Sequence, residues 1–193
     1  MRNFPAKKIN SDEFASEIAG RIDEFEGYVN PHAVRIASFA DALAKQFNLG
    51  SLDRRFLRQA ALVHDIGEFA MNREYINSNR ILSEEECFDM RRHTVIGEQE
   101  AAKRGLSRAV QLMVRWHHEW WNGFGYPDAL RRKQIPLSAA ILRVADTYSA
   151  LTDNRPFRQS VSAKDARQYL TEWAGIEFNP QVVKAFLSLE GLE

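Results

Sequence analysis

The chain has 193 residues, which is the size of one domain or of one domain with a short extension. Lys and Arg together number 26, as do Asp and Glu, so the formal net charge is zero and a protein built around bulk electrostatic attraction to nucleic acid is excluded. The one cysteine, Cys87, excludes an intramolecular disulfide framework and a cysteine-based zinc cluster. Neither a secretory signal nor an apolar run of the ~20 residues that span a bilayer is found. We therefore expect a soluble, cytoplasmic, globular protein that binds neither nucleic acid nor a membrane.

Residues typical of helix starts and stops occur at intervals along the first part of the chain. They predict three helices, over about residues 11–27, 31–50 and 51–64. Asn30 is the expected N-cap of the second helix, with Pro31 at its first helical position. The stretch from Gly67 to Leu82 is less periodic, and it predicts a loop with a short helical turn.

Ser83 and Glu86 form a capping box, the strongest local helix start in the sequence. After a break near His93, the pattern predicts further helices over about residues 93–105, 107–118, 137–151, 162–173 and from 180 onward. The Gly- and Pro-rich segment from Trp121 to Pro127 cannot continue a helix and predicts a loop. Strand-like alternation, internal repeats and low-complexity segments are absent from the sequence, so the expected fold is all-α.

Histidine and aspartate residues stand at the ends of apolar helices, and they carry the expected chemistry. The chain has five histidines: His32, His64, His93, His117 and His118. Asp65 directly follows His64, and Asp146 lies within an apolar helix, where an unpaired carboxylate would be costly. Helices of a bundle that deliver such side chains to one place can build a metal site.

The types of ligand limit the metal. Imidazole and carboxylate without thiolate suit iron, manganese or zinc. Five histidines with Asp65 and Asp146 are too many ligands for one tetrahedral ion, and they suit two ions that share a bridging carboxylate. Taken alone, His32 would instead be interpreted as an ordinary hydrogen-bonded or exposed histidine.

The ordered set of motifs resembles the HD-GYP family of metal-dependent phosphodiesterases, a branch of the HD-domain phosphohydrolases. The resemblance runs from about His32 to Phe186, and all five histidines fall on family positions. Its motifs are His64-Asp65-Ile66-Gly67, His93-Thr94-Val95-Ile96-Gly97, His117-His118-Glu119, Asn122-Gly123-Phe124-Gly125-Tyr126-Pro127, Ile135-Pro136-Leu137, Val144-Ala145-Asp146 and the run from Leu151 to Arg158. The resemblance implies an HD-domain helical bundle with a metal centre in its core, over residues 31–193, preceded by a helical extension over residues 1–30.

The resemblance also implies an activity: hydrolysis of cyclic di-GMP, or of a related cyclic dinucleotide, by a hydroxide that bridges two divalent ions, most readily iron or manganese. The product would be the linear dinucleotide or GMP. The implied metal ligands are His32, His64, Asp65, His93, His117, His118 and Asp146. Asp65 would bridge the two ions, and His64 and Asp65 would form the catalytic pair.

The resemblance places substrate contacts on two loops. Gly125-Tyr126-Pro127 would form part of the substrate pocket, where Tyr126 or Trp121 either stacks on guanine or packs the loop. Arg155 and Arg158 match basic positions that can hold the phosphates, for which the planar guanidinium is well suited. The family also allows a signalling protein such as a GGDEF domain, or a second copy of the chain, as a partner.

Three positions depart from the family pattern. Glu68 replaces the usual lysine of the pocket, which exchanges a cation for an anion near the phosphates. Tyr28 stands where some members have a glutamate that supports a third metal, so two metals are expected, and Asn122 replaces an aspartate. Two alternatives follow: a metal-bound but catalytically weak module that binds a nucleotide or a partner protein, and an HD phosphohydrolase that acts on another phosphoester.

Overall fold

The computed structural model describes residues 10–78, 80–154 and 159–189. Over these residues the chain forms α-helices and short 3-10 helices, and the only bridge of β type is an isolated one between Ala174 and Phe178. The predicted all-α class is therefore confirmed. Within the same residues, no helix combines the length and the apolar character that crossing a membrane requires.

The helices follow the predicted order closely. They are α1 (Ser11–Glu26), α2 (His32–Gln46), α3 (Ser51–Val63), α4 (Ile66–Met71), η1 (Glu74–Asn77), α5 (Glu84–Met90), α6 (His93–Lys103), α7 (Arg108–Trp116), η2 (Arg132–Gln134), α8 (Leu137–Thr152), α9 (Ala163–Glu172) and α10 (Pro180–Leu187).

Side chains of N-cap residues explain the starts of five of the ten α-helices among the described residues. The Asn10 side chain accepts hydrogen bonds from the backbone N–H groups of Asp12 and Glu13 at the start of α1. The capping box of α5 is complete, because Ser83 and Glu86 each accept the backbone N–H of the other. Capping side chains also begin three later helices, those after Ser107, Ser162 and Asn179.

Two local predictions were wrong. Asn30 does not cap α2; instead the Asp23 carboxylate, near the end of α1, accepts the Ala33 N–H at 3.2 and 3.3 Å. That cap crosses from another helix, so no local pattern reveals it. The stretch from Gly67 to Leu82 holds two short helices, α4 and η1, rather than one helical turn.

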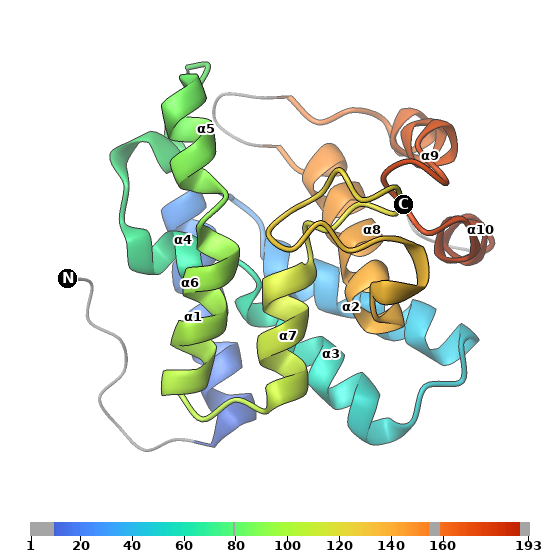
Figure 1. The fold of residues 1–193 in the computed structure, drawn as a ribbon, viewed down its shortest axis with the longest axis horizontal. Helices are drawn as coiled ribbons and strands as arrows, with labels where there is room; N and C mark the ends of the chain where they lie inside the picture. The colour runs from blue at the N-terminus through green and yellow to red at the C-terminus, as the bar shows by residue number, and fades with distance from the viewer. Residues whose placement is uncertain (1–9, 79, 155–158, 190–193) are drawn as a thin grey trace.

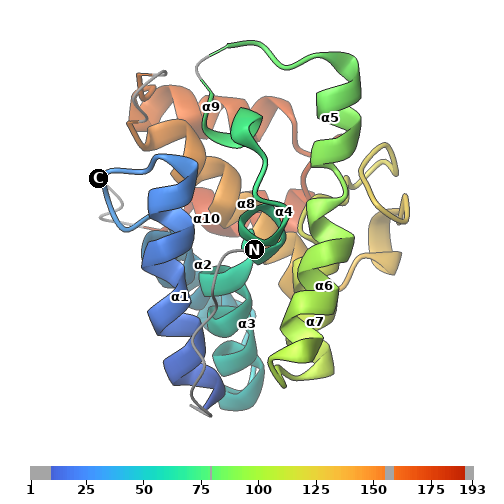
Figure 2. The same ribbon diagram turned by 90° about the vertical axis from the view of Figure 1, so that its left-hand side faces the viewer.

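The helices pack around α8 and leave the histidine-bearing ends in the interior. Figure 1 shows α8 at the centre of the bundle with α7 beside it, and Figure 2 shows α1, α2 and α3 on one side and α6 and α7 on the other. Among the closest packed pairs are α2 with α3, α2 with α8, and α6 with both α4 and α7. The apolar side of α1, which includes Phe14 and Ile22, joins the same hydrophobic core as α8. The division of the chain at residue 30 stays a prediction.

Candidate metal centre

The bundle brings together all seven predicted metal ligands. His32 begins α2 and His93 begins α6, whereas the other histidines directly follow the ends of α3 and α7. Asp146 extends from the middle of α8. These ligands meet in the interior, because the helices that carry them bury apolar side chains in one shared core.

The ligands form two groups, and within each group the ligand atoms lie within 4.8 Å of one another. The first group is Asp65, His93, His117 and His118, and the second is His32, His64 and Asp146. Asp65 reaches both groups: its Oδ1 lies 3.4 Å from Nε2 of His93 and of His117, and its Oδ2 lies 3.1 Å from Nε2 of His64. A carboxylate placed in this way can bridge two cations.

Backbone carbonyls orient three of the histidine rings. Each ring donates Nδ1–H to the carbonyl oxygen three residues earlier, which leaves Nε2 directed to the centre. The pairs are His64 with Ala61 at 2.9 Å, His93 with Met90 at 2.7 Å and His117 with Val114 at 2.7 Å. The tautomer that leaves Nε2 able to bind a metal is therefore built into the helix ends.

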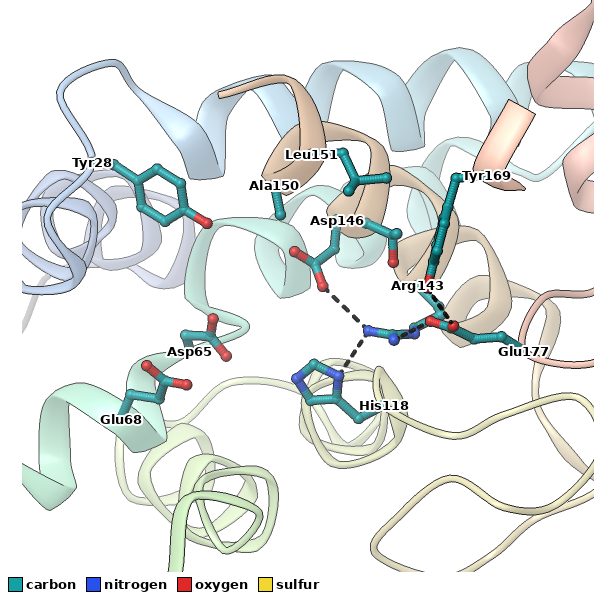
Figure 3. A pocket seen from close by; sticks show the side chains of 11 residues that line it. Tyr28, Asp65, Glu68, His118, Arg143, Asp146, Ala150, Leu151, Tyr169 and Glu177 are labelled. Atoms are coloured by element: carbon teal, nitrogen blue, oxygen red, sulfur yellow. Dashed lines mark hydrogen bonds and ion pairs between the residues drawn. The ribbon is translucent and has the colours of Figure 1, made fainter. Parts of the chain in front are cut away.

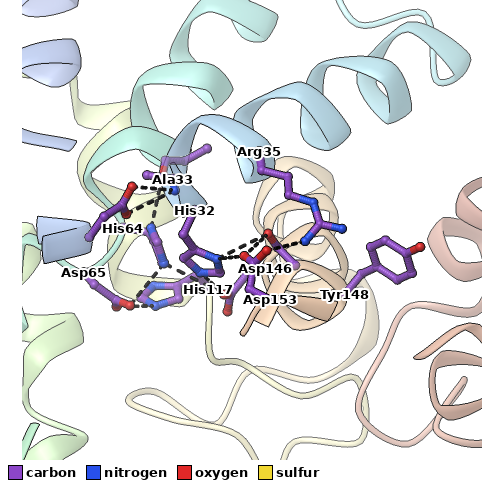
Figure 4. A network of polar contacts seen from close by, with 12 residues as sticks. His32, Ala33, Arg35, His64, Asp65, His117, Asp146, Tyr148 and Asp153 are labelled. Carbon is purple, nitrogen blue, oxygen red and sulfur yellow. Dashed lines mark hydrogen bonds and ion pairs between the residues drawn. The ribbon is translucent and has the colours of Figure 1, made fainter. Parts of the chain in front are cut away.

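A carboxylate orients His32 (Figure 4). Its Nδ1 donates to Oδ2 of Asp153 at 2.7 Å, and Arg35 donates to the other oxygen of that carboxylate at 2.5 Å. The Tyr28 ring stacks on His32 with the ring centroids 3.7 Å apart. Asp153 lies in the motif run from Leu151 to Arg158, but the sequence analysis gave it no role, because no local pattern relates it to His32.

The charges of the centre call for a cation. Although burial alone would raise the pKa of Asp65, the nearby His64 and His117 hold it well below its usual value. Burial lowers the pKa of His93 to about 4, so this ring is a neutral ligand at neutral pH. Among the described residues, Nε2 of His64 and Oδ1 of Asp65 are buried without a hydrogen-bond partner. Buried polar atoms in such positions fit metal ligands, and the oxygen and nitrogen donors fit divalent cations.

A third cluster adjoins the first two. Carboxylate oxygens of Glu26, Asp65 and Glu68 also lie within 4.8 Å of one another. Burial, followed by the charge of Asp65, raises the pKa of Glu68 well above its usual value. The sequence analysis missed Glu26, which comes from the end of α1.

Close backbone approaches explain two motif glycines. A Cβ at Gly67 would lie 1.9 Å from the carbonyl oxygen of His93, so glycine allows α4 to pack against the start of α6. A Cβ at Gly125 would lie 2.2 Å from the Trp120 nitrogen and 2.5 Å from the His118 oxygen. Both glycines therefore position metal ligands through the backbone.

The loop that follows α7 packs against the centre. Tyr126 stacks on His118 with the ring centroids 4.9 Å apart, and the Arg91 guanidinium lies 5.4 Å from the Tyr126 ring. The buried Glu119 accepts the backbone N–H groups of Asp128 and Leu130, which fixes the loop on both sides of its turn.

The structure describes some of the remaining residues that were predicted to contact the substrate, and not others. Trp121, the alternative stacking residue, donates its backbone N–H to the backbone carbonyl oxygen of Glu177 at 2.9 Å and is half-buried. Pro127 follows Tyr126 in a cis peptide bond. Arg155 and Arg158 lie outside the described residues. The substrate contacts predicted for all of these residues stay predictions.

A pocket of about 310 Å³ opens beside the metal centre (Figure 3). Three predicted metal ligands, Asp65, His118 and Asp146, are among its lining residues, together with Glu68. The lining also includes four residues for which the sequence analysis gave no role in substrate binding: Tyr28, Arg143, Tyr169 and Glu177. A substrate in this pocket would therefore lie directly against the ligand cluster.

Comparison with known proteins places the chain in a family. A family model described as HD domain matches residues 22–182. The chain is 30% identical to a cyclic di-GMP phosphodiesterase of Thermotoga maritima, over 90% of this chain and 48% of that protein. It is 33% identical to the cyclic di-GMP phosphodiesterase response regulator RpfG of Xanthomonas campestris, over 91% of this chain and 47% of the relative. The chain thus spans about half the length of these curated relatives.

Solved structures share the fold. A cyclic GMP-AMP specific phosphodiesterase of Vibrio cholerae, V-cGAP3, superposes with a TM-score of 0.73 at 18% identity, over 91% of this chain and 47% of that one. Bd1817, an HDG"Y"P protein of Bdellovibrio bacteriovorus, gives a TM-score of 0.68 at 18% identity, over 92% of this chain and 63% of that one. With the family model matched over most of its length and its relatives named as cyclic dinucleotide phosphodiesterases, the chain belongs to the HD-domain family.

Proposed function

We propose that this domain hydrolyses a cyclic dinucleotide, with cyclic di-GMP as the first candidate, at the centre built around Asp65. The observation that carries the proposal is the position of the Asp65 carboxylate, whose two oxygens face the two ligand groups. The names of the relatives, which include cyclic di-GMP phosphodiesterases and a 3'3'-cGAMP-specific phosphodiesterase, support this substrate class.

We assign two divalent ions, iron or manganese, to the centre. The group of Asp65, His93, His117 and His118 would hold one ion, and that of His32, His64 and Asp146 the other, with Asp65 shared. Such ions supply a hydroxide nucleophile at neutral pH and neutralise charge on the phosphoryl group.

The protein's own contribution is to orient these groups and to shape the pocket. Carbonyl and carboxylate acceptors fix the tautomers of four ligand histidines before any metal binds, which lowers the cost of assembling the centre. The stacked Tyr126 covers His118, and Glu119 anchors the loop that carries it. The predicted phosphate contacts of Arg155 and Arg158 belong to this proposal as well.

The decisive experiment is anaerobic incubation of iron- or manganese-reconstituted protein with cyclic di-GMP, with separation of the products by chromatography. We expect hydrolysis by the unchanged chain and loss of at least about a thousandfold in Asp65→Ala, since that variant removes the shared ligand. Asp53→Ala, at an exposed position in the first turn of α3, is the matched control and should retain activity. Metal-loaded protein that leaves cyclic di-GMP, 3'3'-cGAMP and cyclic di-AMP intact would contradict the proposal.

Glu68 motivates a second candidate, a metal-bound module that hydrolyses weakly and binds a nucleotide or a partner such as a GGDEF domain or a second copy of the chain. Its acidic side chain lines the pocket that a phosphodiester would enter. Tight binding of cyclic di-GMP without turnover would favour this candidate. Turnover of another phosphoester in a substrate panel would instead indicate a different HD phosphohydrolase.

A further inference from the structure

Arg143 lies at the junction of the two ligand groups. It stands on α8 one turn before Asp146, and its Nη1 is 3.7 Å from Oδ2 of that aspartate. The same Nη1 donates to Nδ1 of His118 at 2.8 Å. Figure 3 shows the guanidinium reaching from α8 toward the His118 ring, on the side of the ring away from Asp65. One arginine nitrogen thus contacts a member of each ligand group.

A buried carboxylate holds the other end of the guanidinium. Nη2 of Arg143 donates to Oε1 of Glu177, whose side chain is 3% exposed. Glu177 is in turn fixed by the Tyr169 hydroxyl, which donates to Oε2 at 3.3 Å. The ion pair positions the arginine at the edge of the pocket and leaves the direction of Nη1 to be decided by its other neighbours.

The bond from Arg143 to His118 conflicts with metal binding by that histidine. Because arginine only donates, Nδ1 of His118 must accept, and a neutral imidazole then carries its proton on Nε2. The other ligand histidines have the opposite pattern, with Nδ1 donating to an oxygen. If Nε2 of His118 held a metal, the proton of the neutral ring would be on Nδ1, and Nδ1 could then no longer accept from Arg143.

Nη1 of Arg143 then keeps only its longer approach of 3.7 Å to Asp146, and the pocket provides room for a closer acceptor. Among the described lining residues Arg143 is the single guanidinium or ammonium group, whereas Asp65, Glu68, Asp146 and Glu177 are acidic. A phosphate oxygen is the acceptor that best fits an arginine placed beside two cation sites.

We propose that Arg143 is a substrate-binding residue that donates to a phosphate oxygen, and that metal binding by His118 releases its Nη1 for this contact. The inference rests on the proposed function for the identity of the substrate, a cyclic dinucleotide. The phosphate contact itself can be measured without turnover.

The test titrates inorganic phosphate and, separately, guanosine into manganese-loaded protein by calorimetry, with the bound metal counted in each sample. In Arg143→Gln the Kd for phosphate should rise about 10- to 100-fold, the range for a lost hydrogen bond to a charged group, while the Kd for guanosine stays unchanged. For Arg143→Lys, which keeps the charge but loses the forked guanidinium, the Kd for phosphate should lie between those of wild type and Arg143→Gln. Unchanged phosphate affinity per loaded site in Arg143→Gln would overturn the proposal, as would a loss confined to guanosine.

A double variant addresses the buried partner. Because Arg143→Gln leaves the Glu177 charge buried and unpaired, Arg143→Gln/Glu177→Gln restores a neutral pair. Its phosphate affinity should be as weak as that of the single variant. Recovery of wild-type affinity in the double variant would show that Arg143 acts only through the fold, and would overturn the proposal.

The metal-free protein tests the release. In the absence of metal, Nη1 stays bound to His118, so Arg143→Gln should change the Kd for phosphate less than twofold. An equal effect of Arg143→Gln with and without metal would overturn the proposed release of Nη1 by metal binding. These titrations are separate from the activity assay. If the loaded protein hydrolyses no cyclic dinucleotide but Arg143→Gln still weakens phosphate binding, the proposed function fails and the role of Arg143 stands.

Discussion

Asp153 holds His32 across 121 residues of sequence, with Nδ1 of the histidine donating to the carboxylate at 2.7 Å. The carboxylate is buried, and it is itself held by Arg35 and by the Ser149 hydroxyl, which donates at 3.2 Å. His32 is thus the one predicted ligand among the described residues whose ring is oriented by a carboxylate rather than by a backbone carbonyl or an arginine. A negative partner also makes the imidazole a stronger metal ligand.

We expect Asp153→Asn to weaken binding of the second metal about 10- to 100-fold, the usual cost of removing a group that orients a ligand histidine. Competition of the loaded protein with a chelator of known affinity measures this loss. Asp53→Asn, a change of the same type at an exposed position of α3, should leave the affinity unchanged. Equal metal affinities for Asp153→Asn and wild type would show that binding of the ion at His32, His64 and Asp146 does not depend on the Asp153 carboxylate.

Gly67→Ala is expected to destabilise the fold by several kcal/mol, because its Cβ would lie 1.9 Å from the His93 carbonyl oxygen and α4 would have to move away from α6. Urea denaturation measures the loss. Metal binding should weaken as well, since the displaced backbone carries His93.

Gly20→Ala is the matched control for that variant. Gly20 lies in α1 with nothing within 4 Å of a built Cβ, so alanine should stabilise the helix by about 0.5–1 kcal/mol. The free energy of unfolding should therefore decrease in Gly67→Ala and increase in Gly20→Ala. An increase in stability of the same size in both would mean that backbone entropy, rather than the contact at His93, governs position 67.

Local signals in the sequence explain why the helices could be predicted. Asn10 and Ser83 cap the helices that follow them, and such caps act within a few residues. The ligands could be predicted because their motifs keep a fixed order and because unpaired aspartate in an apolar helix, as at Asp146, is costly.

The contacts between ligands and their partners could not be predicted in the same way. Asp153 with His32, Glu177 with Arg143 and the cap that Asp23 gives to α2 all join segments that meet only after the bundle has packed. Each of these residues is an ordinary charged side chain in the sequence, and only its burial in the fold makes its partner necessary.

The Asp128 carboxylate links the loop that carries Tyr126 to α7, and we expect this link to be sensitive to acid. Hydrogen bonds from Arg115 lower the pKa of Asp128 to about 2, with a further bond from Trp116. A carboxyl group whose pKa is lower in the folded than in the unfolded protein stabilises the fold at pH values above its unfolded pKa of about 4. This stabilisation is lost as the pH falls through the folded pKa. The stability difference between wild type and Asp128→Asn, measured by urea denaturation, should therefore shrink between about pH 4 and pH 2. A difference that stays constant over that range would show that the ion pair contributes nothing.

The number of bound metals tests whether the third cluster, Glu26, Asp65 and Glu68, holds an ion. We expect about two ions per chain, since the two groups that contain histidine offer the stronger ligands for iron and manganese. Glu68→Gln should leave that number unchanged when it is measured by elemental analysis of the loaded protein. A value of three that falls to two in Glu68→Gln would show that Glu26, Asp65 and Glu68 hold an ion of their own.

Position 68 also separates an active enzyme from a binding module. Figure 3 shows Glu68 beside Asp65, across the pocket from Arg143, so the proposed phosphate contact does not pass through it. Because burial and the charge of Asp65 raise the pKa of Glu68, Glu68→Gln removes at most one screened charge at short range and should strengthen cyclic di-GMP binding about fivefold at most. Glu68→Lys should then change turnover by less than about tenfold. A larger gain in Glu68→Lys, with metal content unchanged, would mean that the natural glutamate suppresses hydrolysis and that the chain acts chiefly by binding.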